Sequence, residues 1–492
     1  MLARIALAAL ACVALAVFST EPNPAVPRVQ AAAAAGQSTT TVDDQIDLSV
    51  TVYNSDIALV RDVRNLDLPR GTFELSFMDI AATVNPATVL FRSLSEPARV
   101  SVLEQNYEYD LLEPEKLLRK YVGRDVTLVR TRQVGGTTQE EEVTARLLSY
   151  NNAPVWRIGS EIVTGLHADH IRFPELPDTL HSRPTLIWTL ENGGAARHRV
   201  EAKYLAGKLS WSADYVLTVG RDDRAGDLDG WVTLTNGSGT AFPNAKLQLV
   251  AGDLNRVRQA LDRAGSADEA LVRREYAAAA PMAQEPFSEY HLYTLARKTT
   301  INNNETKQVS MLSGTGFPVQ KRYVVNGNRF YYHNAPRPGA PIRDSVEVFY
   351  QFRNEEKSGL GMPMPAGTVR VYQADSSGGA QFVGEDRIMH TPKDETLNLK
   401  LGNAFDVVCE RNQVDFEKIA ANVYEVEYAI TLRNRKATPI TVEVNEPVGA
   451  ATWRMLTASH KWTKTAAFAA QFMVPLEAGG EAVLTFRIRV NG

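Results

Sequence analysis

The stretch "GKLSWSADYVLTV", residues 207–219, alternates apolar and polar side chains with a period of two. One face of the implied strand is apolar and carries Leu209, Trp211, Ala213, Tyr215, Leu217 and Val219. The other face carries Lys208, Ser210, Ser212, Asp214 and Thr218, with Val216 as the exception. Successive side chains of a strand point to opposite faces, so this pattern predicts a half-buried strand. Ser212 and Asp214 could also form the edge of a nucleophilic site, but the pattern favours a position facing solvent.

The same alternation recurs towards the end of the chain. One apolar set is Tyr424, Val426, Tyr428, Ile430 and Leu432, and another is Leu484, Phe486, Ile488 and Val490. Short runs of this kind, separated by turn residues, are typical of sandwiches and barrels. The alternation of strands and helices that builds a parallel nucleotide-binding sheet is missing. We therefore predict an all-β, mainly antiparallel protein made of tandem β-sandwich or barrel domains.

Two segments interrupt the strand pattern. In "EPEKLLRKYVG", residues 113–123, Pro114 suits the first turn of a helix and Gly123 suits its C-terminal end, which predicts one short helix. Residues 256–280 have helical composition, mixed charge and little continuous apolar face. There we expect a helical or disordered excursion between strands.

The length of 492 residues suits two or three domains better than one core. Composition and turn residues predict the following organisation: a signal peptide at 1–35, a tether at 36–46, an N-terminal β domain at 47–200 with a small barrel-like part at about 121–175, a central β region at 201–345 with an excursion at 253–290, and a C-terminal β-sandwich at 346–492.

The first residues have the pattern of a secretory leader. Arg4 precedes an apolar run at 5–18, followed by small residues. The run is shorter than the roughly 20 apolar residues that a bilayer needs. Cys12 would allow a lipoprotein, but the apolar run continues past it. We therefore expect an exported protein, in the periplasm or at the cell surface, with no transmembrane span in the mature chain.

Charge narrows the possible partners, and cysteine content limits the possible disulfides. The formal net charge is −4, and basic residues are interleaved with acidic ones, which argues against a nucleic acid partner. Removal of the leader leaves Cys409 as the one thiol, so no internal disulfide can form. Its position in a strand-like run predicts a buried, inert thiol.

Two groups of residues are candidates for a metal site. His167 and His170 share a face only on a helix or turn, and no third ligand follows at a metal-binding spacing. The acidic loop "RDDRAGDLDGW" matches a calcium loop only in part, because Ala225 and Asn236 occupy two of its ligand positions. Surface histidines and a solvated turn are favoured, and we expect no metal or cofactor.

Familiar catalytic motifs are also missing from the sequence. It contains no nucleophile elbow, no P-loop and no glycine-rich dinucleotide motif after a strand. A catalytic triad assembled from distant strands remains open. We expect a protein without enzymatic activity.

The remaining lead is the aromatic segment "RFYYHN", residues 329–334. It places Phe330, Tyr331, Tyr332 and His333 together in a predicted loop. Exposed aromatic clusters serve glycans or protein partners, so these four residues are candidate contacts. The alternative is that they fold back over the end of a sandwich.

Several motifs resemble a bacterial envelope family, the one built on domain of unknown function four-one-three-nine. They are "YNSDIALVRDVR", "VLEQNYEYDLL", "FPELPDTLHSRPTLIW", "LSWSADYV", "WVTLTNGSGTAFPNAKLQLVAGDLNRV", "FRNEEKSGLGMPMPAGTVRVYQ" and "LGNAFDVVCERN". The resemblance implies an exported, β-rich protein and supplies no activity, cofactor or catalytic residue. Some relatives carry a preceding coiled coil, but this chain has no heptads there.

Together these features favour a structural or interaction protein of the cell envelope, with an unidentified envelope protein as partner. The alternative is a cell-wall or glycan-binding module that uses the aromatic segment, followed by an unrecognised hydrolase.

Overall fold

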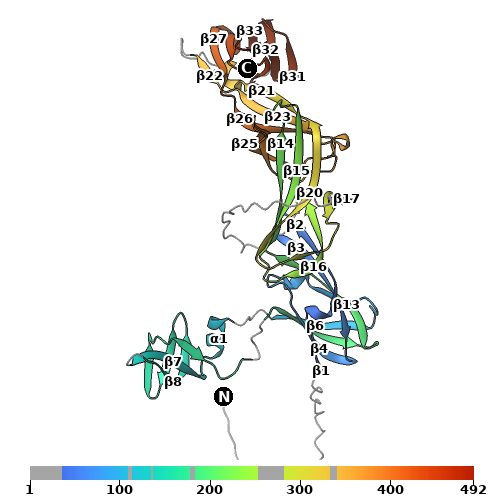
Figure 1. The fold of residues 1–492 in the computed structure, drawn as a ribbon, viewed down its shortest axis with the longest axis vertical. Helices are drawn as coiled ribbons and strands as arrows, with labels where there is room; N and C mark the ends of the chain where they lie inside the picture. Colours follow the sequence, from blue (N-terminus) through green and yellow to red (C-terminus); the bar gives the residue numbers. More distant parts are fainter. Residues whose placement is uncertain are drawn as a thin grey trace, which may run out of the picture.

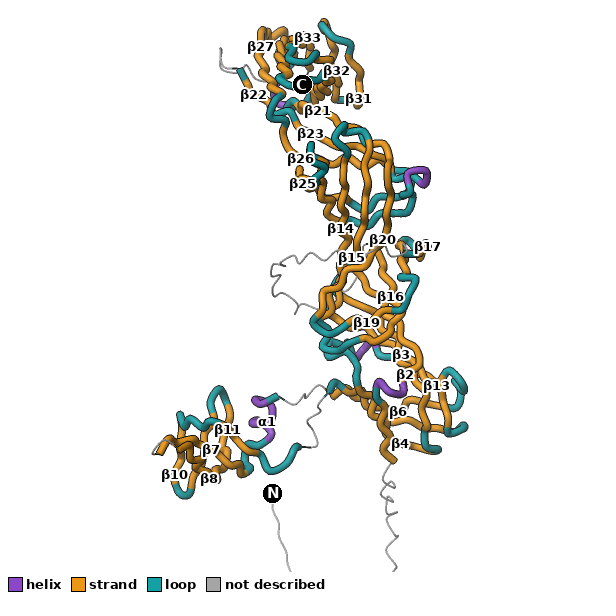
Figure 2. The backbone as a smooth tube through the Cα atoms, viewed as in Figure 1, coloured by secondary structure: helices purple, strands orange, loops and turns teal. Residues whose placement is uncertain are grey.

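The structure is a computed structural model and describes residues 36–108, 113–134, 137–177, 183–252, 282–332, 341–450 and 452–491. The predicted signal peptide and residues 253–281 of the predicted excursion at 253–290 lie outside these residues. The rest of that excursion was predicted wrongly, because residues 283–287 form strand β17, which pairs with β18. The all-β, mainly antiparallel fold is confirmed: strands form six sheets, and four of the strand pairs are parallel. Figure 2 shows how little of the described chain is helical.

The predicted helix is confirmed as α1 (Pro114–Lys120), with Pro114 in its first turn. It is the one α-helix among the described residues. Four short 3-10 helices accompany it: η1 (Val42–Asp44), η2 (Pro86–Thr88), η3 (Arg329–Tyr332) and η4 (Glu356–Ser358). The described helices are too short to cross a bilayer.

Five of the sheets follow one another along the molecule, and we number them I to V. Sheets I and II lie at the N-terminal end of this series. The strands of each sheet are named in the order in which they neighbour one another. Sheet I contains β1 (Gly36–Thr40), β4 (Gly71–Met78), β12 (Thr185–Asn192) and β6 (Val100–Glu108). Sheet II contains β17 (Ala283–Phe287), β18 (Tyr290–Thr294), β16 (Phe242–Ala251), β2 (Gln45–Tyr53), β3 (Ile57–Asp67), β13 (Arg197–Gly207) and β5 (Leu90–Ser93), and β16 also pairs with β19 (Thr299–Ile301).

The other three sheets of the series make up the rest of the long body. Sheet III contains β20 (Glu305–Pro318), β15 (Ala225–Asn236), β14 (Leu209–Val219), β24 (Gly367–Ala374) and β25 (Ala380–Ile388). Sheet IV contains β26 (Thr396–Asn403), β23 (Glu347–Arg353), β21 (Gln320–Asn326), β29 (Ile440–Pro447), β32 (Ala469–Leu476) and β31 (Trp462–Ala466). Sheet V contains β22 (Ile342–Asp344), β27 (Val407–Ala420), β28 (Val423–Asn434), β33 (Glu481–Asn491) and β30 (Thr452–Ala458).

Aromatic pairs mark the packing of each sheet on the next. Phe91 of sheet II meets Trp188 of sheet I, Trp211 of sheet III meets Tyr293 of sheet II, Phe317 of sheet III meets Phe352 of sheet IV, and Phe472 of sheet IV meets Phe486 of sheet V, with ring centroids 4.6–6.4 Å apart. One continuous apolar cluster runs from sheet I to strands β23 and β26 of sheet IV, and a second fills the sandwich of sheets IV and V. The sheets therefore form an elongated column, from β1 and β4 at one end to β33 at the other (Figure 1).

The sixth sheet forms a small side domain with α1. Its strands, in order, are β10 (Glu161–Thr164), β9 (Pro154–Ile158), β8 (Thr137–Tyr150), β7 (Asp125–Val134) and β11 (His170–Arg172). Tyr121 and Trp156 are the largest side chains of its separate core. A small barrel-like part was expected at about 121–175, but β10 and β11 remain the two ends of an open sheet in the described residues.

The chain is divided differently from the prediction at three places. Residues 36–40 of the expected tether form β1, which pairs in parallel with β4, because a small polar sequence can add to an edge through its backbone alone. The expected boundary at 200/201 falls within β13, and β16 returns to pair with β2. The expected boundary at 345/346 also fails, because β24 and β25 of the predicted C-terminal domain complete sheet III while the earlier β21 belongs to sheet IV.

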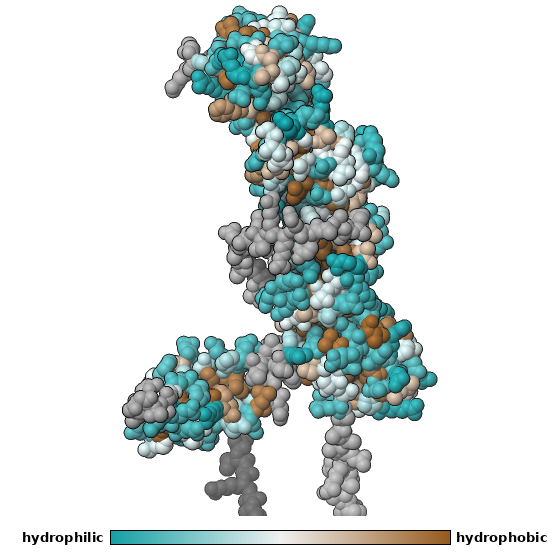
Figure 3. Space-filling view, viewed as in Figure 1, coloured by the Kyte–Doolittle hydropathy of each residue, from teal (hydrophilic) through white to brown (hydrophobic). Residues whose placement is uncertain are grey.

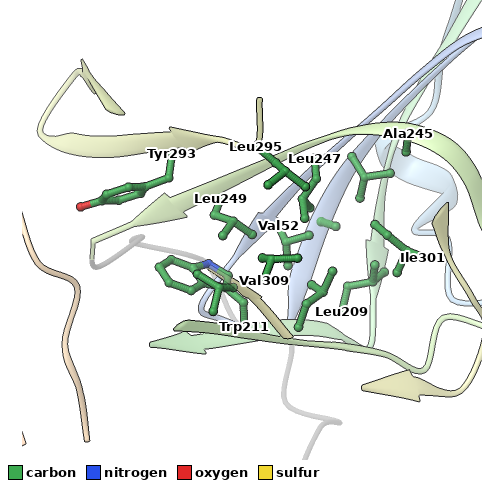
Figure 4. Packing of buried hydrophobic residues seen from close by; sticks show 14 of the residues in the cluster. Val52, Leu209, Trp211, Ala245, Leu247, Leu249, Tyr293, Leu295, Ile301 and Val309 are labelled. Carbon is green, nitrogen blue, oxygen red and sulfur yellow. The ribbon is translucent and has the colours of Figure 1, made fainter. Parts of the chain in front are cut away.

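The half-buried strand predicted from the alternating stretch is confirmed as β14. All six apolar side chains of the inward face are buried. Figure 4 shows Trp211 packed near Val52, Leu249 and Val309. Burial of a large apolar side chain stabilises a fold by roughly 1.5–3 kcal/mol, so this face fixes the orientation of the strand.

Candidate functional site

The aromatic segment 329–332 forms η3 at the end of the sandwich of sheets IV and V. Phe330 is 58% exposed, Tyr331 is half-buried and Tyr332 is fully buried. His333 lies outside the described residues. The prediction that Tyr332 contacts a partner is therefore wrong, because its side chain points into the sandwich, whereas Phe330 does face solvent.

A hydrogen bond to a buried carboxylate explains the position of Tyr332. Its hydroxyl donates to Glu446 Oε2 at 2.5 Å, and its ring packs edge-on against Tyr428 with centroids 5.8 Å apart. Burial raises the pKa of Tyr332, and the charge of Glu446 raises it further. The hydroxyl therefore stays protonated and acts as a donor.

Arg411 of β27 occupies the centre of the same group. Its Nε donates to Asp344 Oδ2 at 2.8 Å and its Nη2 to Glu446 Oε1 at 2.6 Å. The guanidinium also lies 5.0 and 5.5 Å from the ring centroids of Tyr331 and Tyr428. Burial opposes its charge, but Glu446 more than compensates and holds the pKa of Arg411 above its ordinary value.

These contacts define what the group can do. Arg411 is 0% exposed and Glu446 is 1% exposed, so a ligand in solvent reaches neither. An arginine held in this way cannot act as a base. The group ties β22, β27, β29 and η3 together and fixes the backbone that presents Phe330.

Ser212 and Asp214 both lie on the outward face of β14. Asp214 accepts hydrogen bonds from Thr233 at 2.9 Å and from Arg370 at 3.0 Å, and Ser212 is exposed. The inward Tyr215 donates to the Pro365 carbonyl at 2.8 Å. The prediction that Ser212 and Asp214 point away from the core is confirmed, and Asp214 joins strands of sheet III.

Cys409 is buried, with 1% of its surface exposed. Burial raises the pKa of its thiol to about 12. Since the thiolate is the nucleophilic form, this position disfavours reaction at neutral pH.

The histidine pair lies in the side domain, where both side chains are exposed. Asp169, between them in the chain, accepts a hydrogen bond from the Thr131 backbone N–H at 2.5 Å. This bond lowers the pKa of Asp169, and His167 and His170 lower it further. Within the described ranges, no three His, Cys, Asp or Glu side chains gather as metal ligands.

The acidic loop divides its carboxylates among separate partners. Asp223 accepts from Gln373 at 2.7 Å and from Tyr350 and Lys321 of sheet IV, so it joins two sheets. Asp227 and Asp229 instead accept from residues of β20 at 2.7 and 2.8 Å. Asp222 caps the turn through the Arg224 N–H at 3.3 Å. The four carboxylates do not converge on one point.

A cavity of about 210 Å³ lies where sheets I and II meet. Its polar walls include Gln45, Asp62, Asp79 and Thr240. Both carboxylates are already paired, Asp62 with Arg64 at 2.8 Å and Asp79 with Arg183 at 2.5 Å. This lining provides no pairing of a nucleophile with a base.

Sequence reasoning missed the two buried arginines, Arg64 and Arg411, although the sequence contains a signal for both. Arg411 follows Cys409 with the spacing of the inward face, and Arg64 stands in phase with Val60 and Leu66 on β3. A charged residue at an inward position predicts a buried partner, but the partner's identity depends on long-range pairing.

The visible surface of the column is mostly hydrophilic, with scattered apolar patches (Figure 3). Comparison with known proteins yields neither a matching family model nor a similar curated protein.

Proposed function

We propose that the protein is exported to the cell envelope and acts there as a structural and interaction scaffold without catalytic activity. The observation that carries this proposal is how the polar side chains at and beside the candidate sites are used. Asp214, Asp223 and Glu446 join strands or sheets to one another, which suits a scaffold. The secretory leader and the envelope-family resemblance in the sequence support the location.

The proposed partner is another envelope protein, contacted by surfaces spread along the column and side domain. Several large apolar side chains are available for such contacts. Ile162 of the side domain is 65% exposed, and Phe405, in the turn between β26 and β27, is 95% exposed. Exposed aromatic and aliphatic anchors are common centres of protein interfaces.

In vivo photo-cross-linking tests this proposal. A cross-linking amino acid at position 162 or 405 should give a discrete adduct in intact cells, and the same substitution at exposed Lys393 is the control. Protease treatment before and after outer-membrane permeabilisation should distinguish a surface from a periplasmic location. A cytoplasmic chain, or no adduct above background at either position, would contradict the proposal.

A second candidate function, cell-wall or glycan binding, is favoured by the exposure of Phe330. The buried Tyr332 no longer supports it, so the substitution that tests it is Phe330→Ala. Binding to isolated cell wall should weaken in this variant. Binding that is unchanged by the substitution would remove Phe330 from the candidate site.

A further inference from the structure

An aromatic and cationic surface extends beyond Phe330 on the sandwich of sheets IV and V. At one edge of this sandwich, Trp453 of β30 and Trp462 of β31 meet with ring centroids 5.8 Å apart. Both rings are partly buried against the core, and Trp453 Nε1 donates to the Ala467 carbonyl at 2.8 Å. The pair closes the gap between the two sheets while leaving part of each indole exposed.

Backbone contacts connect this tryptophan pair to Phe330. Phe468 follows Ala467, is 53% exposed, and accepts the Val448 N–H at 2.7 Å through its carbonyl. Gly449, which follows Val448, packs so closely on Arg329 that an added Cβ would lie 2.9 Å from the Arg329 carbonyl oxygen. These backbone contacts place the segments that carry Phe330, Phe468 and the tryptophan pair next to one another. We group their accessible side chains as the aromatic flank: Arg329, Phe330, Trp453, Trp462, Lys464 and Phe468.

The charge of the aromatic flank is positive. Lys464 Nζ lies 5.0 Å from the Trp453 ring, and the Arg329 guanidinium lies 4.8 Å from the Phe330 ring. In the described residues, the side-chain contacts of both cations are with these rings. The sequence from 447 to 476 contains three Lys or Arg residues and no Asp or Glu, although the whole chain carries a net charge of −4. The flank therefore suits an anionic ligand.

The neighbouring backbone disfavours addition of a partner strand. β30 and β31 are terminal strands of their sheets, but each is short and contains a bulge, at Met455/Thr457 and at Lys464/Ala466. Short, bulged and lysine-bearing edges resist strand pairing. Recognition here depends on side chains, not on a backbone ladder.

We propose that the aromatic flank binds an anionic polysaccharide. The C–H face of a pyranose ring can cover an exposed phenyl or indole face, while its carboxylates meet Arg329 and Lys464. An acidic polypeptide offers the charge but no ring to stack, and bulged edges deny it backbone pairing. The inference rests on the glycan-binding function proposed above and names its ligand class and residues.

Binding of the purified full chain to three polymers tests the proposal. Polygalacturonate supplies rings and charge, dextran supplies rings alone, and poly-L-glutamate supplies charge alone. We expect measurable binding to polygalacturonate in 50 mM salt. The affinity for dextran and for poly-L-glutamate should each be on the order of tenfold weaker. The affinity for polygalacturonate should fall as added salt screens the two cations.

Substitutions at exposed positions locate the site without disturbing the core. Phe330→Ala with Phe468→Ala should lower polygalacturonate affinity on the order of tenfold, and Lys464→Gln should lower it several-fold and flatten the salt dependence. Phe405→Ala and Lys357→Gln, at exposed positions outside the flank, are matched controls and should leave the affinity unchanged.

Equal binding to poly-L-glutamate, or affinity unaffected by the flank variants, would overturn the proposal. A parallel measurement with isolated cell wall separates the two levels of inference. Wall binding that is lost in the Phe330→Ala variant, without any binding to polygalacturonate, would overturn the anionic ligand class and keep the glycan function. Binding to neither would overturn both.

Discussion

Arg64 near one end of the column and Arg411 near the other are both 0% exposed, yet they are stabilised in different ways. Arg64 pairs with Asp62, two residues away on the same strand, and lies 3.6 Å from the Phe77 ring centroid. Arg411 pairs with Asp344 and Glu446, which come from separate strands. Arg64 also donates to the Met78 carbonyl at 2.9 Å and to the Thr40 hydroxyl at 3.4 Å. The first arrangement therefore has one carboxylate and neutral acceptors of sheet I, whereas the second has two carboxylates.

The unpartnered atoms of the two regions differ as well. In the N-terminal pair, Asp62 Oδ1 is buried without a hydrogen-bond partner, whereas in the C-terminal network this holds for Arg411 Nη1. Removing Arg64 therefore leaves one carboxylate without its cation, and removing Arg411 leaves two carboxylates without theirs. Since a buried charge without its partner is strongly destabilising, the network should be the more sensitive region.

The largest expected effect is that of Arg411→Met. It should destabilise the sandwich of sheets IV and V by about 4 kcal/mol, because Asp344 and Glu446 lose their cation. Unfolding is measured as the reaction of Cys409 with a thiol reagent at increasing denaturant concentration. The other cysteine of the sequence is replaced in this experiment (Cys12→Ser), so that Cys409 alone reacts. Arg343→Met, at a surface arginine 3.5 Å from Glu410, should change stability by less than about 0.5 kcal/mol. Equal effects of the two substitutions would contradict the assigned network.

Arg64→Met should have a smaller effect, about 3 kcal/mol, because methionine retains packing on Phe77 and one carboxylate is left unpaired. Regional hydrogen exchange should show the loss in sheets I and II. Adding Asp62→Asn should recover much of it, since the stranded charge is then removed. A double variant as unstable as the single one would argue that Arg64 acts mainly through packing.

Two tyrosine substitutions sharpen the comparison. Tyr332→Phe removes a hydrogen bond to the Glu446 carboxylate and should cost about 2 kcal/mol, because bonds to charged groups are stronger than neutral ones. Tyr204→Phe removes only an acceptor of the Ala81 N–H at 3.3 Å and should cost about 1 kcal/mol. Chemical denaturation of both variants measures the difference, and the reverse order would contradict it.

The smallest effect concerns acid sensitivity on the outer face of sheet V. Arg489 and Arg487 lower the pKa of Glu425 below its usual 4.5. This contribution is present above pH 4.5 and is lost as the pH falls through the lowered value of the folded state. Glu425→Gln should therefore reduce the loss of stability between pH 4.5 and pH 3, measured through Cys409 protection. If the pH dependence of stability is the same in the variant, titration of Glu425 does not contribute to the loss of stability in acid.

Local patterns predicted the strands better than they predicted strand partners. The alternation in β14, β28 and β33 fixed which side chains are buried, because a period of two acts residue by residue. The parallel pairs β2–β16 and β14–β24 join segments far apart in the chain, and no local pattern encodes them. For that reason the predicted domain boundaries at 200/201 and 345/346 differ from the structure.

The candidate site shows a similar limit. The segment 329–332 was recognisable by its aromatic residues, but a 3-10 turn has no two-residue alternation, so the burial of Tyr332 beside exposed Phe330 could not be read from spacing. Trp453, Trp462 and Phe468 lie more than a hundred residues away and join this surface only through the folded sandwich.

The return of β24 to the side of β14 has a consequence for biogenesis. β14 ends at Val219, but its parallel neighbour is complete only when residue 374 has been made. The middle of the molecule thus keeps an unfinished hydrogen-bonding edge throughout synthesis of the intervening chain. Sheet III is therefore completed late, and a chaperone that covers the open edge of β14 until residue 374 emerges would limit wrong strand pairing.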